Sequence, residues 1–367
     1  MKKRILNIVG ARPNFMKVAP IQRLMLQSQA LEPRLVHTGQ HYDAAMSKVF
    51  FNDLGMPEPD IYLGVGSGSH AVQTSQVMIE LEKVMQEMKP DLVLVVGDVN
   101  STLAASIVAS KLWIPVAHVE AGLRSNDRTM PEEINRILTD AVAELLFVTE
   151  KSGLENLKKE GTPHEKVYFV GNVMIDSLVQ NLKSARNSTI LEQLALDERG
   201  YSLVTLHRPN NVDNRENFTK ILDAFEVIQQ KIKIIFPIHP RTRKMIKELG
   251  FTSRIEEMKN LTLLDPIGYL DFIRLTEKSK FVLTDSGGIQ EETTYLGIPC
   301  LTLRENTERP ITIEVGTNQL IGMDTSKIID AGLKILAGSA KKGKIPEFWD
   351  GHTAERIVRI VEEKFYH

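Results

Sequence analysis

Short apolar runs alternate with longer amphipathic stretches along the chain, and this alternation limits the possible folds more than any other feature. Most of the runs are apolar throughout rather than at every second residue, which is typical of parallel strands covered by helices on both faces. The pattern predicts an α/β fold with parallel sheets. The expected strands of the first half are Ile5–Val9, Arg34–His37, Leu92–Val96, Val116–Val119, Leu145–Val148 and Val167–Val170.

The pattern restarts in the second half of the chain. A length of 367 residues suits two domains. We therefore predict two Rossmann-like, doubly wound domains, residues 1–172 and 173–352, with a C-terminal helix over 353–367 that packs back on the first domain. A helix and a linker are expected within Leu178–Gly200. The expected strands of the second domain are Ser202–Leu206, Ile234–Ile238, Leu261–Leu264, Phe281–Thr284 and Cys300–Leu303.

The net charge and the cysteine content exclude several classes of partner and of metal site. The formal net charge is −2, which argues against a nucleic acid or an anionic membrane as partner. The single cysteine, Cys300, permits no intrachain disulfide and no cysteine-rich zinc site. The apolar run after the basic N-terminus is too short for a signal peptide, and no run reaches the length of a membrane span. A cytoplasmic location is expected.

Two loops with similar surroundings follow strands in the two halves. Gly97-Asp98 follows one strand, and Asp285-Ser286-Gly287-Gly288 follows another, each before an expected helix and a further strand. Ligands of open α/β sheets bind at the carboxyl ends of the strands. We therefore expect the two domains to face each other across a ligand-binding cleft.

The stretch Asp285–Glu292 has the features of a phosphate site. Ser286, Gly287 and Gly288 open a helix whose first N–H groups can bind an anion, and glycine lets the anion approach closely. Glu292 lies one to two turns further on, where it can bind a ribose diol. The alternative interpretation of the Gly-Gly pair is a strand-to-helix turn capped by Ser286.

Basic residues follow two further strands. The turn Gly10–Lys17 lacks the Gly-x-Gly-x-x-Gly pattern, which argues against NAD or FAD. Arg12 and Lys17 can instead place positive charge over a diphosphate, unless the turn is simply solvated. In the second half, His207 and Arg208 suit a phosphate oxygen, and His207 can supply a proton. Arg309, in a charged loop after a strand, is a weaker candidate because such loops are usually solvated.

Three carboxylates are candidates for proton transfer: Asp98, Glu120 and Glu132. Asp98 and Glu120 end neighbouring strands, so both can point to one place, and two like charges held close would raise the pKa of one of them. Glu132 follows Pro131 at the expected start of a helix. Its alternative role is compensation of the helix dipole.

Taken together, these motifs resemble the non-hydrolysing UDP-N-acetylglucosamine 2-epimerases. The resemblance runs in order over nearly the whole chain, and its most specific parts are Asp285–Glu292 and His118–Arg124. The other matching strings are Gly10-Ala11-Arg12-Pro13, Gly97-Asp98, Pro131–Arg136, His207-Arg208 and Thr307–Pro310.

The resemblance implies a fold of the GT-B type, a homodimer, and reversible conversion of UDP-GlcNAc to UDP-ManNAc for cell-surface polysaccharide synthesis. Neither a nicotinamide cofactor nor a metal is expected. The family reaction eliminates UDP to give a 2-acetamidoglucal and then adds it back. By resemblance, Asp98, Glu120, Glu132 and His207 are catalytic, Arg12, Ser286 and Gly287 contact the diphosphate, and Glu292 binds the ribose.

Other functions are compatible with the same sequence. They are an epimerase of a related UDP-2-acetamido sugar, a hydrolysing epimerase, a GT-B glycosyltransferase and a nucleotide-sugar sensor without activity; a dinucleotide oxidoreductase ranks last. Many family members have Glu where this chain has Asn14 and Ile311, so the preferred sugar can differ.

Activation by substrate at a second site is expected to be weak or absent. Gln40 fits one residue of the family's activating site, but Gly66-Ser67-Gly68-Ser69-His70 replaces its Arg-Gln pair. Initial rates against substrate concentration should therefore be hyperbolic. Strongly sigmoidal rates that become hyperbolic on addition of UDP-GlcNAc would contradict this expectation.

Overall fold

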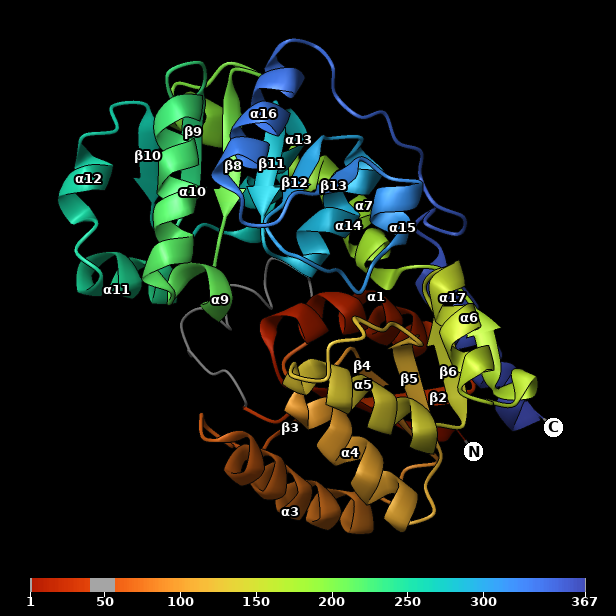
Figure 1. Cartoon of the computed structure of the whole chain (residues 1–367). Coiled ribbons are helices and arrows are strands. Elements are labelled where there is room, and N and C mark those ends of the chain that lie inside the picture. Colours follow the sequence, from red (N-terminus) through yellow and green to blue (C-terminus); the bar gives the residue numbers. More distant parts are fainter. Residues whose placement is uncertain (1, 40–56, 367) are drawn as a thin grey trace. The chain divides into compact units, whose positions relative to one another are not determined.

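The computed structural model describes residues 2–39 and 57–366, which form two compact units. Unit 1 comprises Met1–Gln180 and Glu347–His367, and unit 2 comprises Asn181–Pro346. Figure 1 labels the helices and strands of both units, and each unit is described by itself.

Unit 1 is built on a parallel sheet with the strand order β3-β2-β1-β4-β5-β6-β7. This order reverses direction beside β1, as in a doubly wound fold, and it leaves the ends of β1, β4 and β5 side by side. The strands are β1 (Lys3–Val9), β2 (Leu31–His37), β3 (Ile61–Tyr62), β4 (Leu92–Val96), β5 (Val116–Ala121), β6 (Leu145–Val148) and β7 (Val167–Phe169); the helices are α1 (Arg12–Gln27), α3 (His70–Met88), α4 (Asn100–Lys111), α5 (Pro131–Val142), α6 (Lys151–Lys159), α7 (Val173–Ala185) and α17 (Thr353–Tyr366).

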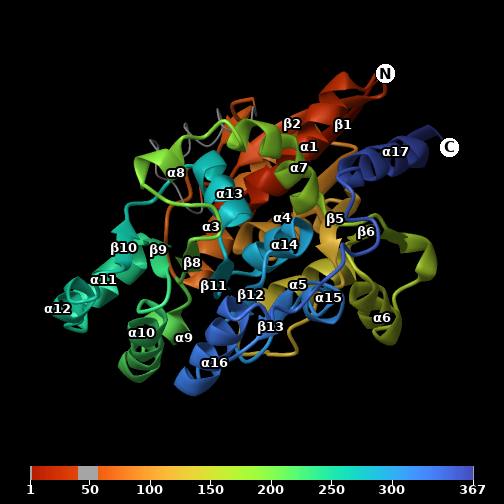
Figure 2. The ribbon, with the colours of Figure 1, turned by 90° about the horizontal axis from the view of Figure 1, so that it is seen from above.

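Helices cover both faces of this sheet. On one face α3, α4 and α5 pack side by side, as Figure 1 shows, and bury a core of small and branched side chains from the sheet and the helices. On the other face α1 packs against α17, and the two helices lie next to each other in Figure 2. The central strand β4 is consequently buried along its whole length, which explains its continuously apolar sequence.

The boundaries of the units differ from the expected ones at 172/173 and 352/353. The first turns of α7 stay with unit 1, because the Ser177 hydroxyl donates to the Met16 carbonyl and Asp176 accepts hydrogen bonds from Thr353 and Ala354. The chain also rejoins unit 1 before α17, since the buried Trp349 indole donates to the Thr149 carbonyl at 3.1 Å. The expected packing of the C-terminal helix on the first domain is present.

Unit 2 has a second parallel sheet with the order β10-β9-β8-β11-β12-β13. One face is covered by α10 and α16, which pack against each other, and the other face carries a smaller apolar cluster with α8 and α13. The strands are β8 (Tyr201–Thr205), β9 (Lys233–Pro237), β10 (Leu261–Leu264), β11 (Phe281–Thr284), β12 (Cys300–Thr302) and β13 (Asn318–Leu320); the helices are α8 (Ile190–Gln193), α9 (Pro209–Val212), α10 (Arg215–Ile228), α11 (Pro240–Glu248), α12 (Thr252–Glu256), α13 (Tyr269–Lys278), α14 (Gly287–Leu296), α15 (Ile311–Glu314) and α16 (Thr325–Leu336).

The expected strands are all present, with ends that shift by a few residues at most. Two edge strands, β3 and β13, were not predicted. They are two and three residues long, too short to give an apolar pattern of their own. The two sheets in succession confirm two Rossmann-like domains, the domain composition of the GT-B type.

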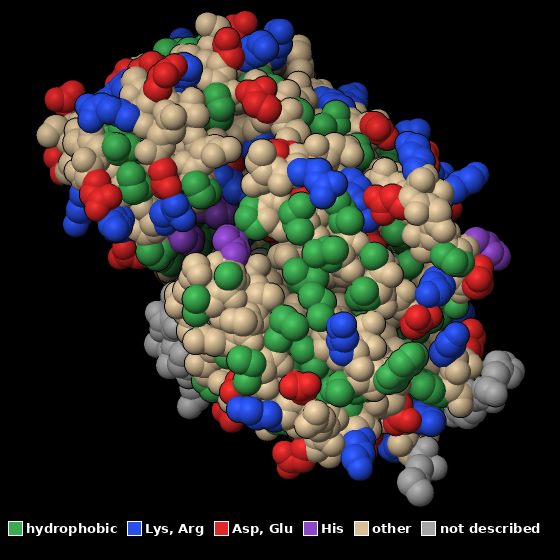
Figure 3. Space-filling model, turned by 60° about the horizontal axis from the view of Figure 1, so that its bottom comes forward, with side chains coloured by type: hydrophobic (Ala, Val, Ile, Leu, Met, Phe, Trp, Pro, Cys, Tyr) green, Lys and Arg blue, Asp and Glu red, His purple; other side chains and the backbone are tan. Residues whose placement is uncertain are grey.

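The distribution of charge on the surface agrees with the small net charge of the sequence. On the face drawn in Figure 3, Lys and Arg side chains are interspersed with Asp and Glu, and among the described residues neither sign forms an extended patch there. Within residues 2–39 and 57–366, no helix is long and apolar enough to cross a membrane.

Stability should depend on pH through Asp176, whose buried carboxylate accepts the first N–H groups of α17. Burial raises the pKa of Asp176 from 3.8 to about 6. The protonated form is thus favoured in the folded state, so this contribution is complete below about pH 4 and is lost as the pH rises through 6. Relative to Asp176→Asn, the wild type should lose about 2 to 3 kcal/mol of unfolding free energy over that range.

Urea titrations of both proteins, followed by tryptophan fluorescence, measure this difference. Both tryptophans, Trp113 and Trp349, lie in unit 1, so the signal reports the unit that contains Asp176. A difference between the two proteins that stays constant from pH 4 to pH 7 would show that Asp176 titrates normally.

Candidate active site

Glu120 occupies a strained position at the carboxyl end of β5. The pairing of β5 with β6 shifts in register between Val119 and Ala121, so Glu120 is the extra residue of a β-bulge. Its φ of 76° lies in the left-handed region, which costs a residue with a Cβ about 1 to 2 kcal/mol. The side chain is nevertheless only 3% exposed. Such strain in a buried carboxylate is typical of a functional site.

Lys17 supplies the cation for this carboxylate. It lies in α1, directly after β1, and its Nζ is 2.5 Å from Glu120 Oε2. Both side chains are less than a tenth exposed, so little water surrounds the pair. Each buried charge is therefore stabilised by the opposite charge of its partner. The sequence suggested that Lys17 binds a diphosphate; in the structure its ammonium contacts Glu120, and the diphosphate contact stays a prediction. Arg12 is the first residue of the same helix.

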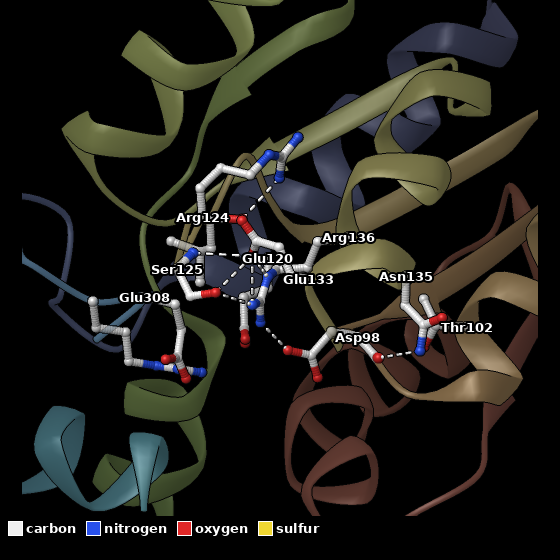
Figure 4. A network of polar contacts seen from close by, with 12 residues as sticks. Asp98, Thr102, Glu120, Arg124, Ser125, Glu133, Asn135, Arg136 and Glu308 are labelled. Atoms are coloured by element: carbon white, nitrogen blue, oxygen red, sulfur yellow. Dashed lines mark hydrogen bonds and ion pairs between the residues drawn. The ribbon is translucent and has the colours of Figure 1, made fainter. Parts of the chain in front are cut away.

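Asp98 has a cation of its own. It follows β4, the strand next to β5, and forms an ion pair with the Arg136 guanidinium of α5, drawn in Figure 4. Its backbone carbonyl accepts a hydrogen bond from the Asn135 amide at 2.8 Å. Glu120 and Asp98 thus each have a cation within ion-pair distance, Lys17 and Arg136, and the mutual influence expected of the two carboxylates stays a prediction.

Glu133 fixes the orientation of Arg136. Its buried carboxylate accepts hydrogen bonds from the Ser125 and Asn126 N–H groups at 2.9 Å and from the Arg136 guanidinium (Figure 4). Burial alone would raise the pKa of Glu133, but these donors outweigh it and lower the pKa. Arg136 is therefore held from one side by Glu133 and reaches Asp98 from the other.

Glu132 lies in the first turn of α5, half-buried, four residues before Arg136. This spacing places the two side chains on the same face of the helix. Sequence reasoning selected Glu132 but not Arg136 or Asn135. The i, i+4 spacing within Pro131–Arg136 was the signal that could have identified Arg136.

Asn14, one of the two departures from the resemblance noted above, makes two hydrogen bonds at the start of α1. Its side-chain oxygen accepts the Ala11 N–H at 3.0 Å, and its amide donates to the Val96 carbonyl at 2.9 Å. The side chain thereby caps α1 and ties it to the end of β4. A carboxylate at this position would lack the second, donating contact. The second departure, Ile311, is the first residue of α15. Gln40, which bears on the activation hypothesis, lies outside the described residues.

In unit 2, the expected phosphate loop begins α14. Ser286 is the N-cap residue, and its side chain makes no capping hydrogen bond within the described part of the chain, unlike the simple capped turn considered above. Gly287 has no space for a side chain, since a Cβ there would lie 2.5 Å from Arg309 Nη1. Gly288 follows in the first turn. The helix start thus offers N–H groups and a hydroxyl at the carboxyl end of β11.

His207 and Arg208 follow β8, the strand next to β11, and are oriented by Asp285. The buried Asp285 carboxylate lies 3.0 Å from His207 Nδ1 and accepts the backbone N–H groups of His207 and Arg208. Burial alone would raise the pKa of Asp285, but the contacts with His207 and the N–H groups lower it. Because Nδ1 faces the carboxylate, Nε2 is the ring nitrogen that can serve a ligand.

Glu292 and Arg309 are both buried in the same unit. Tyr269, which the sequence did not single out, donates its hydroxyl to Glu292 Oε1 at 3.1 Å and so orients this carboxylate. Arg309 donates to Glu291 at 2.7 Å and also pairs with Glu308. The structure thus gives Arg309 two carboxylate partners beneath the start of α14, and its contact with a ligand stays a prediction.

The Lys17–Glu120 pair should dominate the stability of its part of unit 1. Lys17→Met removes the cation 2.5 Å from the buried Glu120 carboxylate and should lower the free energy of unfolding by about 3 to 5 kcal/mol. Adding Glu120→Gln removes that charge, so the double variant should be more stable than Lys17→Met alone. Urea unfolding followed by tryptophan fluorescence measures all four proteins of this cycle. Effects that simply add would mean that the two side chains do not interact.

Comparisons with known proteins identify the family of this chain. The family described as UDP-N-acetylglucosamine 2-epimerase matches residues 24–362. The UDP-N-acetylglucosamine 2-epimerase of Methanocaldococcus jannaschii is 45% identical over 360 residues, 96% of this chain and 97% of that protein. The UDP-2,3-diacetamido-2,3-dideoxy-D-glucuronate 2-epimerase of Pseudomonas aeruginosa is 43% identical over 331 residues, 89% of this chain and 91% of that protein.

Solved structures give the same result. The crystal structure of the Methanocaldococcus jannaschii UDP-GlcNAc 2-epimerase in complex with UDP-GlcNAc and UDP has a TM-score of 0.91 at 44% identity, covering 98% of this chain and 99% of that one. The Neisseria meningitidis enzyme bound to UDP-GlcNAc has a TM-score of 0.88 at 30% identity, covering 98% and 100%. The chain described above belongs to the UDP-N-acetylglucosamine 2-epimerase family.

Proposed function

We propose that this enzyme interconverts UDP-GlcNAc and UDP-ManNAc by reversible elimination and re-addition of UDP, without hydrolysing the substrate. The observation that carries the proposal is the buried Glu120–Lys17 pair, in which a strained strand end holds a carboxylate away from water. A carboxylate held in a fixed place and screened from water in this way can be aligned with a weakly acidic C–H bond of a bound sugar.

In the elimination step a carboxylate takes the C2 proton, and the C2–H electron pair forms the C1=C2 double bond. The bond between C1 and the diphosphate oxygen breaks, and UDP leaves with its electrons, giving a 2-acetamidoglucal. In the return step that oxygen bonds C1 again while an acid delivers a proton to the opposite face of C2. Glu120, Asp98 and Glu132 are the groups that we assign to these proton transfers.

The leaving diphosphate needs positive charge and hydrogen-bond donors. We assign this role to the start of α14, with Ser286, Gly287 and Gly288, and to Arg12 and Arg208. His207 is suited to protonate or stabilise the departing phosphate, since Asp285 holds its ring by Nδ1. Glu292, oriented by Tyr269, is the proposed partner of the ribose hydroxyls.

A related sugar nucleotide is the second candidate substrate. It is favoured by the Pseudomonas aeruginosa relative, which is named for a 2,3-diacetamido glucuronate and is nearly as similar in sequence as the relative named for UDP-GlcNAc. The chemistry at C1 and C2 is the same for both substrates. Only the groups at C3 and C6 differ, so both use the same proton-transfer residues.

Proton NMR of the purified enzyme with UDP-GlcNAc in D2O tests the proposal. We expect UDP-ManNAc that carries deuterium at C2, with little free UDP, because solvent exchanges with the catalytic acid between the two steps. Accumulation of free UDP and free ManNAc would indicate a hydrolysing epimerase instead. With UDP-GlcNAc unchanged, turnover of the 2,3-diacetamido glucuronate would establish the second candidate, and a requirement for an acceptor would indicate a glycosyltransferase.

A further inference from the structure

We propose that the buried pair of His118 and Asp140 is a positioning device that holds together the three segments carrying the proton-transfer carboxylates of unit 1. Asp98 follows β4, Glu120 ends β5 and Glu132 lies in α5, and the pair contacts all three segments. The proposal rests on the proposed function for its effect on catalysis, while its structural part can be tested without any substrate.

The contacts of the pair reach both strand ends. His118 lies in β5, two residues before Glu120; its Nδ1 is 2.6 Å from Asp140 Oδ1 and its Nε2 is 2.9 Å from the Gly97 carbonyl. Asp140 lies in α5, and its Oδ2 accepts the Gly122 N–H at 3.0 Å. One imidazole and one carboxylate therefore connect the end of β4, the end of β5 and α5.

The pair is shielded from water, since both side chains are buried. The carbonyl and the carboxylate both accept hydrogen bonds, and each faces one nitrogen of the ring. Burial alone would raise the pKa of Asp140, but His118, Arg124 and the Gly122 N–H lower it. Arg124 Nη1 lies 2.8 Å from Asp140 Oδ2 and balances the pair further, and Figure 4 shows Arg124 among this network.

The peptide groups that the pair binds are those that orient the catalytic side chains. The Gly97 carbonyl belongs to the peptide that joins Gly97 to Asp98, and the Gly122 N–H lies just beyond the bulge at Glu120. Both glycines have positive φ, 65° at Gly97 and 79° at Gly122, and glycine leaves the backbone with more freedom than other residues do. The hydrogen bonds that these peptide groups form with the buried His118–Asp140 pair restrict that freedom.

His118 does not itself transfer protons to substrate. Its side chain is fully buried, and both ring nitrogens are engaged inside unit 1. Its effect is therefore on the position of Asp98 and Glu120, and a displacement of about 1 Å can reduce a rate about 100-fold. This separates the pair from His207, which is more than a third exposed.

The test compares Asp140→Asn and His118→Asn with the control Asp176→Asn. Asn at 118 keeps a donor for Asp140 but loses the contact with Gly97. The control removes another buried carboxylate of unit 1 that accepts two backbone N–H groups, far along the chain from the strand ends. Hydrogen exchange followed by mass spectrometry is measured on the ligand-free proteins, and kcat and KM are measured with UDP-GlcNAc.

We expect faster exchange in residues 96–102 and 118–125 for Asp140→Asn and His118→Asn, but not for Asp176→Asn. The kcat of these two variants should fall about 10- to 100-fold with KM changed less than threefold, while the control keeps its kcat within about twofold. Unchanged exchange in both segments, or an equal loss of kcat in the control, would overturn the proposal. A wild type inactive on UDP-GlcNAc would refute the proposed function, and the exchange data would still decide the structural part.

Discussion

The buried ion pair between Lys17 and Glu120 is the interaction on which the candidate active site of unit 1 depends. Removing two charges from water is costly, and the cost is offset only if their geometry is well held. The β-bulge at Glu120 and the tight capping of α1 by Asn14 provide that geometry from opposite sides. The ends of β1 and β5 are thereby held in a single arrangement. A carboxylate exposed to water would not need its surroundings fixed in this way.

Helix α5 organises the rest of this site. It carries Glu132, Glu133, Asn135, Arg136 and Asp140 within nine residues. Asn135 and Arg136 contact Asp98, Glu133 contacts Arg136, and Asp140 contacts His118 of β5. The position of this one helix therefore affects the ends of both β4 and β5. Unit 2 uses the same principle on a smaller scale, since Asp285 orients His207 and Tyr269 orients Glu292.

Much of the fold followed from the sequence because parallel strands covered on both faces leave a clear apolar pattern. The edge strands β3 and β13 left no such pattern. Among the site residues, carboxylates and glycines at strand ends could be found from their place in the chain. Their partners could not, because Lys17 meets Glu120, and Tyr269 meets Glu292, only through tertiary packing. The left-handed φ of Glu120 likewise depends on the bulge and has no sequence signature.

The central claim is that Glu120, held by Lys17, transfers a proton at C2 of the sugar. The most direct measurement is the rate at which Glu120→Gln forms C2-deuterated UDP-ManNAc from UDP-GlcNAc in D2O, with UDP binding checked by calorimetry. Loss of an acid–base group costs about 100- to 10,000-fold. We therefore predict a fall of at least about 100-fold with UDP affinity unchanged. A rate within about threefold of the wild type would contradict the claim.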